Sequence, residues 1–121
     1  MKNVDVSIVI PAYNEERNLK RGVLEDVWNY LRKQKYRWEV IVVDDFSKDN
    51  TASVVKKFKQ VKLVRQPYNK GYGSALKTGS SNAKGKWLCF YDSDDQFYPE
   101  YLIKLLSFRK NYDMIIGNRK G

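Results

Sequence analysis

Apolar residues recur along the chain in short blocks that predict strands and helices in alternation. The strand pattern is a period of two, as in 4–10, or a continuous β-branched run, as in 40–43. Apolar residues spaced by three or four positions predict helices, and Asn14, Ser47 and Asp49 are suited to cap their beginnings. The predicted strands are 4–10, 40–43, 61–65, 87–91 and 114–116, with Pro11 ending the first. The predicted helices run from 14 to 33, from the cap at 47–49 through 58, across 75–83, and onward from Pro99.

This alternation predicts an α/β fold, in which a mostly parallel sheet of five strands has helices on both faces. A continuous apolar run such as 40–43 is typical of a strand that is covered on both sides. If the strand order is 3-2-1-4-5, the second, first and fourth strands are neighbours. We expect residues 1–121 to form a single Rossmann-like domain, because the chain contains no linker, repeat or low-complexity tract.

Composition narrows the chemistry that the chain can perform. Its 121 residues include 23 basic, 14 acidic and no histidine residues, with a formal net charge of +9. The missing histidines remove the commonest general base and zinc ligand, so catalysis would rest on carboxylates, cations or a metal. The positive charge favours anionic partners, although a generally solvated basic surface explains it as well.

Two further features bear on the environment of the chain. Cys89 lies in an apolar run and has no partner for a disulfide, which predicts a small buried core residue. No apolar run approaches the roughly 20 residues of a membrane-spanning helix. We therefore expect a soluble, cytoplasmic chain without a transmembrane segment.

The stretch 90–96 brings three carboxylates and an amide to the end of the fourth predicted strand. In an extended chain Asp92, Asp94 and Gln96 would point the same way. Carboxylate and amide oxygens suit Mg²⁺ or Mn²⁺. The alternative is a solvated turn that caps the helix expected from Pro99.

Polar residues also follow the other strands that would be neighbours in the sheet. They are found at 11–15 after the first strand, at 44–45 after the second, and at 92–96 after the fourth. Ligands of open parallel sheets bind beyond the carboxyl ends of the strands, where the strand order reverses. This convergence favours a ligand site with a metal over a solvated turn.

Other motifs carry less weight. Gly71-x-Gly73 opens a helix, but Leu76 occupies the third position of the dinucleotide fingerprint, and the chain has no Gly-x-x-x-x-Gly-Lys-Ser/Thr phosphate loop. Nucleic acid fits poorly, because the carboxylates at the cleft would repel its phosphate backbone. A basic nucleic-acid-binding module and a non-catalytic ligand-binding fragment remain as alternatives to an enzyme.

Four segments together resemble family 2 glycosyltransferases, which have the GT-A fold. These segments are 7–16, 42–51, 69–71 and 92–96, and their order and spacing are those of the family. The Asp-x-Asp-x-Gln form and the late segment 116–119 are most similar to the polyprenyl-phosphate sugar transferases, such as dolichol-phosphate mannose synthase.

The resemblance implies roles for particular residues, with Glu15 accepting hydrogen bonds from ribose hydroxyls and Asp45 binding the edge of the base. The implied nucleotide-binding residues are Pro11, Ala12, Tyr13, Glu15, Val43, Asp45, Lys70 and Asp92. The implied ligands of Mg²⁺ or Mn²⁺ are Asp92, Asp94 and Gln96. Asp94 and Arg119 are the implied catalytic residues, and Lys70 and Arg119 would face the diphosphate.

The implied reaction transfers a sugar with inversion from a nucleotide sugar, GDP-mannose first and UDP-glucose second. The implied acceptor is a polyprenyl phosphate at the cytoplasmic face of a membrane. A lipid phosphate is largely a dianion at neutral pH and can attack without a general base. Two features depart from the family pattern: Phe46 stands where glycine is usual, and relatives continue past the fifth strand with an acceptor-binding half. We therefore expect this chain to be the donor-binding part.

Overall fold

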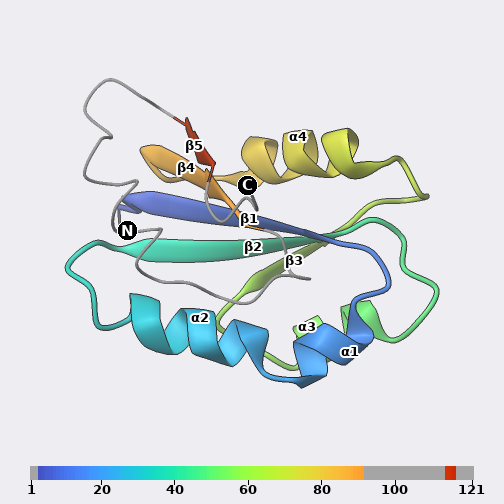
Figure 1. Ribbon diagram of the computed structural model, residues 1–121. Coiled ribbons are helices and arrows are strands. Elements are labelled where there is room, and N and C mark those ends of the chain that lie inside the picture. The colour runs from blue at the N-terminus through green and yellow to red at the C-terminus, as the bar shows by residue number, and fades with distance from the viewer. Residues whose placement is uncertain (1–2, 92–113, 117–121) are drawn as a thin grey trace.

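Five parallel strands form a single sheet at the centre of the molecule (Figure 1). The structure is a computed structural model, and it describes residues 3–91 and the backbone of 114–116. The strands are β1 Val6–Ala12, β2 Trp38–Asp44, β3 Lys62–Arg65, β4 Trp87–Phe90 and β5 Met114–Ile116. Their order, β3-β2-β1-β4-β5, and the parallel pairing of all neighbours confirm the predicted topology. The helix expected from Pro99 lies outside the described residues.

Helices cover both faces of this sheet (Figure 1). On one face lie α1 Glu16–Lys20, α2 Val23–Leu31 and α3 Thr51–Lys56, and on the other lies α4 Tyr72–Asn82. Side chains of β1 alternate between the two cores: Ile8 and Ile10 pack with the first three helices, and Val9 packs with Ala75 of α4. The central strands are therefore apolar at successive positions, because both of their faces are covered.

β1 continues through Ala12, so the expectation that Pro11 ends this strand is wrong. Pro11 is paired with Val43 of β2. In a parallel strand, alternate peptide groups face alternate neighbours, and the carbonyl of Val9 accepts a hydrogen bond from the segment just after β4. Pro11 faces the same side as Val9, but the β1–β4 pairing ends at Val9 and Phe90. The N–H that proline lacks would therefore face a position where β4 has no residue paired with β1, so Pro11 costs the sheet no hydrogen bond between these strands.

The helix predicted from 14 to 33 is in fact two helices. Gly22 separates them with a φ of 101°, a left-handed conformation that costs glycine little. The apolar stripe continues across the break, because Leu19, Val27 and Leu31 are all buried in one core. Asn14 does not cap α1, since its own φ is 53° and its side chain forms no cap hydrogen bond.

Close packing of α4 on the sheet depends on small residues of this helix. A Cβ on Gly79 would lie 2.2 Å from Cγ1 of Val9 and 3.2 Å from Cγ2 of Val43. In the other core Cys89 is buried, and this burial raises the pKa of its thiol to about 12. The prediction that Cys89 is a buried core residue is confirmed.

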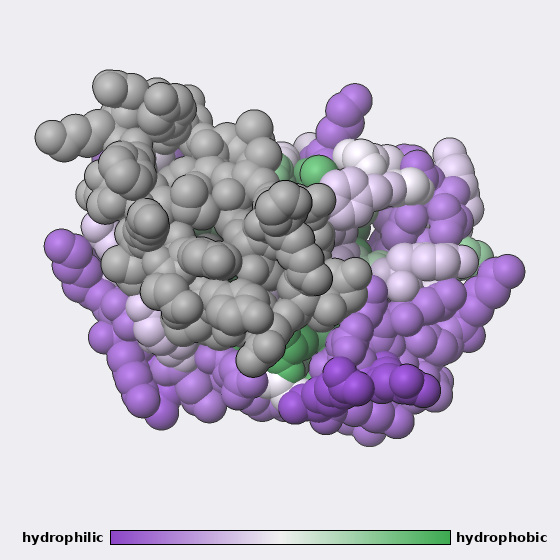
Figure 2. Space-filling view, in the orientation of Figure 1, coloured by the Kyte–Doolittle hydropathy of each residue, from purple (hydrophilic) through white to green (hydrophobic). Residues whose placement is uncertain are grey.

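The described surface is mostly hydrophilic in the view of Figure 2. Among the residues that the structure describes, no helix is both long and apolar enough to cross a membrane.

Candidate functional site

The loops that follow β1, β2 and β3 lie at the carboxyl edge of the sheet (Figure 1). We call them the β1 loop (residues 13–15), the β2 loop (45–50) and the β3 loop (66–71). The predicted convergence of the first two loops is confirmed, because β1 and β2 are paired along their whole length. The segment that begins at Asp92 after β4 lies outside the described residues, and so does Arg119.

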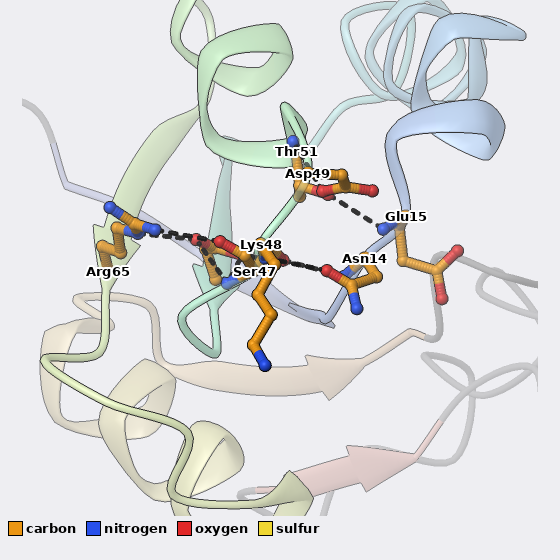
Figure 3. Close-up of polar contacts among 8 residues, drawn as sticks. Asn14, Glu15, Ser47, Lys48, Asp49, Thr51 and Arg65 are labelled. Carbon is orange, nitrogen blue, oxygen red and sulfur yellow. Dashed lines mark hydrogen bonds and ion pairs between the residues drawn. The ribbon is translucent and has the colours of Figure 1, made fainter.

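Hydrogen bonds join the β1 loop to the β2 loop and to the first residue of α3 (Figure 3). The N–H of Asn14 donates to Oγ of Ser47 at 2.8 Å, and Oδ1 of Asn14 accepts from the N–H of Lys48 at 2.9 Å. The N–H of Glu15 donates to Oγ1 of Thr51 at 2.9 Å. Ser47 therefore links two loops and is not the helix cap that the sequence suggested.

Asp49 adds hydrogen bonds between the start of α1 and the start of α3, a contact region that we call the α1–α3 junction. Its Oδ1 accepts from the N–H of Thr51 at 2.9 Å, and its Oδ2 accepts from the N–H of Glu16 at 3.3 Å. Burial opposes the ionisation of Asp49, but the hydrogen bonds from Thr51 outweigh it and lower the pKa of this carboxyl. The hydrogen bond from the Lys20 ammonium, at 2.9 Å, is the main cause of a lowered pKa at Glu16.

Asp44 ends β2 and is completely buried. Arg65 ends β3 in register with it, and Nε of Arg65 lies 3.0 Å from Oδ2 of Asp44. Nη2 of Arg65 donates to the carbonyl of Ser47 at 3.0 Å, and the Ser47 N–H and hydroxyl both donate to Asp44 (Figure 3). A buried carboxylate needs this compensation, because burying an unpaired charge is costly. Asp44 is therefore fully engaged within the protein.

Asp45 ties the β2 loop to the β3 loop. It is only 5% exposed, and its two oxygens accept from the N–H groups of Lys70 and Gly71, each at 2.9 Å. A carboxylate offers about four lone-pair sites, so these two hydrogen bonds leave capacity for a further donor. The geometry is compatible with the predicted contact between Asp45 and the base edge, which stays a prediction.

Exposed aromatic residues also gather at this edge of the sheet. Within the described part of the chain, the exposed large apolar side chains are Tyr13, Phe46, Tyr68 and Tyr72, at 40–59% exposure. Phe46 has a φ of 64°, and only Asn14 in the adjoining loop shares a positive φ among the described non-glycine residues. Such backbone conformations concentrate at functional sites.

The predicted nucleotide-binding residues that the structure describes lie in or beside these loops. They are Pro11, Ala12, Tyr13, Glu15, Val43, Asp45 and Lys70. Val43 is fully buried in the core beneath α4 and is paired with both β1 and β3, so its side chain does not reach the surface. Tyr13 and Lys70 are exposed, while the Glu15 carboxylate points away from the β2 loop (Figure 3) and accepts from Nδ2 of Asn18 at 2.7 Å.

Sequence reasoning missed Arg65, although a signal for it existed. A basic residue ends the third predicted strand and an acidic residue directly follows the second, and the strand order makes these two strands neighbours. The second strand extends one residue beyond its predicted end, and this extension places Asp44 opposite Arg65. The link between Glu15 and Thr51 left no comparable signal, because it depends on the path of two loops.

The predicted metal ligands, Asp92, Asp94 and Gln96, lie outside the described residues. The residues that are described contain no group of three or more side chains able to hold a metal. β4 runs parallel to β1 and therefore ends at the carboxyl edge of the sheet, where the N–H of Tyr91 donates to the carbonyl of Val9 at 3.0 Å. The oxygen donors of the Asp-x-Asp-x-Gln sequence fit Mg²⁺ or Mn²⁺ by their chemistry.

Comparison with known proteins agrees with this architecture. Residues 7–121 match glycosyl transferase family 2. The chain therefore belongs to this family, and its sheet and helices form the GT-A fold that the sequence led us to expect.

The curated relatives are longer proteins. The chain is 35% identical to the dolichyl-phosphate beta-glucosyltransferase ALG5D of Trichomonas vaginalis, over 96% of this chain and 40% of that protein. It is 36% identical to a dolichol-phosphate mannosyltransferase of Pyrococcus furiosus, over 94% of this chain and 33% of that protein. The chain thus spans between one third and two fifths of the length of these two relatives.

Two solved structures share the fold. TarS 1-349 of S. aureus, in complex with UDP-GlcNAc, has a TM-score of 0.70 and 30% identity, over 90% of this chain and 32% of the TarS chain. The mannosyltransferase PcManGT from Pyrobaculum calidifontis, in complex with GDP-Man and Mn²⁺, has a TM-score of 0.76 over 93% of this chain and 34% of its own. At 24% identity the second likeness concerns the fold alone.

Proposed function

We propose that this chain binds a nucleotide sugar at the carboxyl edge of its sheet and contributes to transfer of the sugar to a polyprenyl phosphate. The observation that carries the proposal is that hydrogen bonds hold three loops in place at that edge. Asp45 holds the β3 loop, Asn14 holds the β1 loop to the β2 loop, and Glu15 holds the β1 loop to the start of α3. Such a preformed set of loops can bind a ligand at little cost in conformational entropy.

The family of the chain supports a nucleotide sugar as the ligand. The S. aureus structure at 30% identity is a complex with UDP-GlcNAc. Relatives of the chain carry the names of dolichyl-phosphate glucosyltransferases and of a dolichol-phosphate mannosyltransferase. We retain both UDP-glucose and GDP-mannose as donors, and the three glucosyltransferases at 34–35% identity make UDP-glucose the first to test.

The proposed reaction needs stabilisation of the charge that develops on the leaving diphosphate. Lys70 is exposed on the β3 loop and is one proposed cation, and Arg119 is the other. Asp92, Asp94 and Gln96 would hold Mg²⁺ or Mn²⁺, which when bound supplies Lewis-acid stabilisation of the diphosphate. An acceptor phosphate dianion can attack the anomeric carbon directly, with inversion and without the histidine that the chain lacks.

A non-catalytic role in nucleotide-sugar binding is the second candidate. The chain spans 33–40% of the length of the curated relatives described above, and their names refer to the whole proteins. Under this alternative the loops would bind the donor in the same way, and transfer would require further protein sequence.

The test is a panel of ligands measured by thermal stabilisation, with and without Mn²⁺. UDP-glucose and GDP-mannose should raise the melting temperature in a Mn²⁺-dependent manner, because a ligand at about 100 times its Kd stabilises the fold by about 2.7 kcal/mol. Asp94→Ala should remove the Mn²⁺ dependence while leaving the circular dichroism spectrum unchanged. A panel in which neither nucleotide stabilises the chain would refute the proposal.

A further inference from the structure

Phe46 occupies a backbone conformation that does not suit its side chain. Its φ of 64° lies in the left-handed region, where glycine and asparagine are tolerated and a bulky aromatic residue is an outlier. Burial in the core does not explain why phenylalanine stands at this position, because the residue is 40% exposed. An aromatic ring that is both strained and exposed calls for a functional explanation.

Arg65 fixes the position of this ring. The centre of its guanidinium lies 4.9 Å from the centroid of the Phe46 ring. The same guanidinium bonds to the Asp44 carboxylate and to the carbonyl of Ser47, the residues on either side of the Asp45–Phe46 pair. The ring is therefore held against a cation that is itself held at two points.

Phe46 directly follows Asp45, and both residues lie in the β2 loop at the carboxyl edge of the sheet. Asp45 is the residue proposed to accept from the edge of the nucleobase, and its carboxylate keeps acceptor capacity after bonding the β3 loop. A flat, uncharged base suits an aromatic surface, whereas a phosphate does not. Adjacent residues would then supply the two contacts that a base needs, one at its edge and one against its plane.

We infer that Phe46 binds the base of the nucleotide sugar by stacking and that Arg65 is a positioning residue that holds the ring for this contact. The inference rests on the proposed function, since it concerns the same site. It assigns a binding role to the residue at which this chain departs from the glycine that is usual in the family. It also explains why the strained backbone is retained.

The test compares substitutions that separate the ring from the backbone. Phe46→Gly and Phe46→Asn remove the ring and suit the left-handed conformation, whereas Phe46→Trp keeps an aromatic surface. Titration calorimetry with UDP, GDP and inorganic pyrophosphate in the presence of Mn²⁺ distinguishes a contact with the base from a contact with the diphosphate. Thermal melting of each variant reports its effect on the fold.

We expect Phe46→Gly and Phe46→Asn to bind UDP and GDP about 5- to 150-fold more weakly, the range typical of a lost aromatic stacking contact. Their affinity for pyrophosphate should not change, and their melting temperatures should equal or exceed that of the parent chain. Phe46→Trp should retain nucleotide affinity, with added fluorescence that UDP quenches and pyrophosphate does not.

The role of Arg65 is tested by a double-substitution cycle. Arg65→Lys keeps the charge beside Asp44 but loses the planar guanidinium. It should weaken UDP binding when Phe46 is present and have no further effect together with Phe46→Gly. An additional loss in the Phe46→Gly background would assign Arg65 to the loop structure and overturn its positioning role.

The outcomes separate this inference from the proposed function. If the parent chain binds UDP or GDP and Phe46→Gly binds them equally well, the stacking role is overturned and the proposed function stands. An equal loss of nucleotide and pyrophosphate affinity would mean that the ring supports the loop, which also overturns the inference. If the parent chain binds neither nucleotide, both proposals fail together.

Discussion

Asp44 and Asp45 are adjacent in the chain but have different partners, because one ends β2 and the other begins the β2 loop. Asp44 is paired with the Arg65 guanidinium. Asp45 is held by two main-chain N–H groups, and within the described part of the chain it forms no salt bridge. Peptide N–H groups stabilise a carboxylate without cancelling its charge. This contrast favours Asp45 over Asp44 as the residue that meets a ligand.

Asp45→Ala should weaken binding of UDP and GDP without abolishing its dependence on Mn²⁺. The substitution also leaves the N–H groups of Lys70 and Gly71 without their acceptor, which should lower the free energy of unfolding by about 1–3 kcal/mol. Titration calorimetry and urea unfolding measure the two effects. Asp45→Asn retains one acceptor oxygen and should lose less stability. If Asp45→Ala binds the nucleotide as tightly as the parent, the carboxylate only holds the loops.

At the level of residues, the sequence could place Asp45 and Asn14 at the edge of the sheet but could not predict their partners. Those partners belong to other loops, and their positions depend on loop conformations that hydrophobic periodicity does not encode. The positive φ of Phe46 was unpredictable for a second reason, since the intrinsic preference of an aromatic residue opposes it.

At the level of elements, the strands and their order could be predicted because each is an apolar block that ends at polar residues. The errors fall where a local rule is overridden by tertiary structure. Pro11 remains in β1 because β2 still pairs with it after the β4 pairing has ended. The first helix divides at Gly22, a break that the continuous apolar stripe concealed.

The fit of α4 on the sheet leads to a prediction about two glycines of that helix. Gly79→Ala should lower the free energy of unfolding, because overpacking against Val9 costs about 1–3 kcal/mol and exceeds the gain of roughly 1 kcal/mol in helix propensity. Gly73→Ala is the matched control, since a Cβ there meets no atom within 4 Å. Urea unfolding should show this control to be neutral or stabilised. Equal stabilisation by both substitutions would contradict the close packing.

The junction between α1 and α3 should be sensitive to acid. Asp49 and Glu16 both have lowered pKa values in the folded chain. Such carboxyls stabilise the fold above their ordinary pKa, and this contribution is lost as the pH falls through the folded value. The free energy of unfolding should therefore decrease as the pH falls below about 4. Unfolding in urea between neutral and acidic pH measures this slope.

Two substitutions at the junction test the origin of that slope. Asp49→Asn and Glu16→Gln should each reduce it, because each removes one of the carboxyls that gain protons on unfolding. Glu25→Gln is the control, since Glu25 is an exposed residue of α2 away from the junction. A slope that survives both junction substitutions would show that other groups control the response to acid.

At the scale of the whole molecule, charge and architecture favour the same class of ligand. A net charge of +9 attracts anions, and both a nucleotide diphosphate and a polyprenyl phosphate are anionic. The carboxyl edge nevertheless carries two acidic residues, Asp45 in the β2 loop and the buried Asp44 at the end of β2. The attraction of the positive net charge for anions therefore does not select the ligand at this edge. Selection at that edge has to come from the loops, through hydrogen bonds and aromatic surface.

The last prediction is that this chain binds its donor more effectively than it transfers the sugar. The β1, β2 and β3 loops, which we propose bind the donor, are held together by hydrogen bonds within residues 3–91. The chain matches only 40% of the length of the Trichomonas vaginalis glucosyltransferase ALG5D. Positioning of an acceptor can supply about 7–11 kcal/mol of a reaction barrier, so the rate depends on acceptor contacts far more than donor affinity does.

The measurement compares UDP-glucose and GDP-mannose affinity with sugar transfer to a short-chain polyprenyl phosphate, using that longer relative as the positive control. We expect Mn²⁺-dependent nucleotide binding by this chain, together with turnover well below that of the relative. Asp45→Ala should weaken binding in the same assay and serves as the negative control. Turnover by this chain equal to that of the relative would show that 121 residues suffice for both donor and acceptor, and the division between binding and transfer would be wrong.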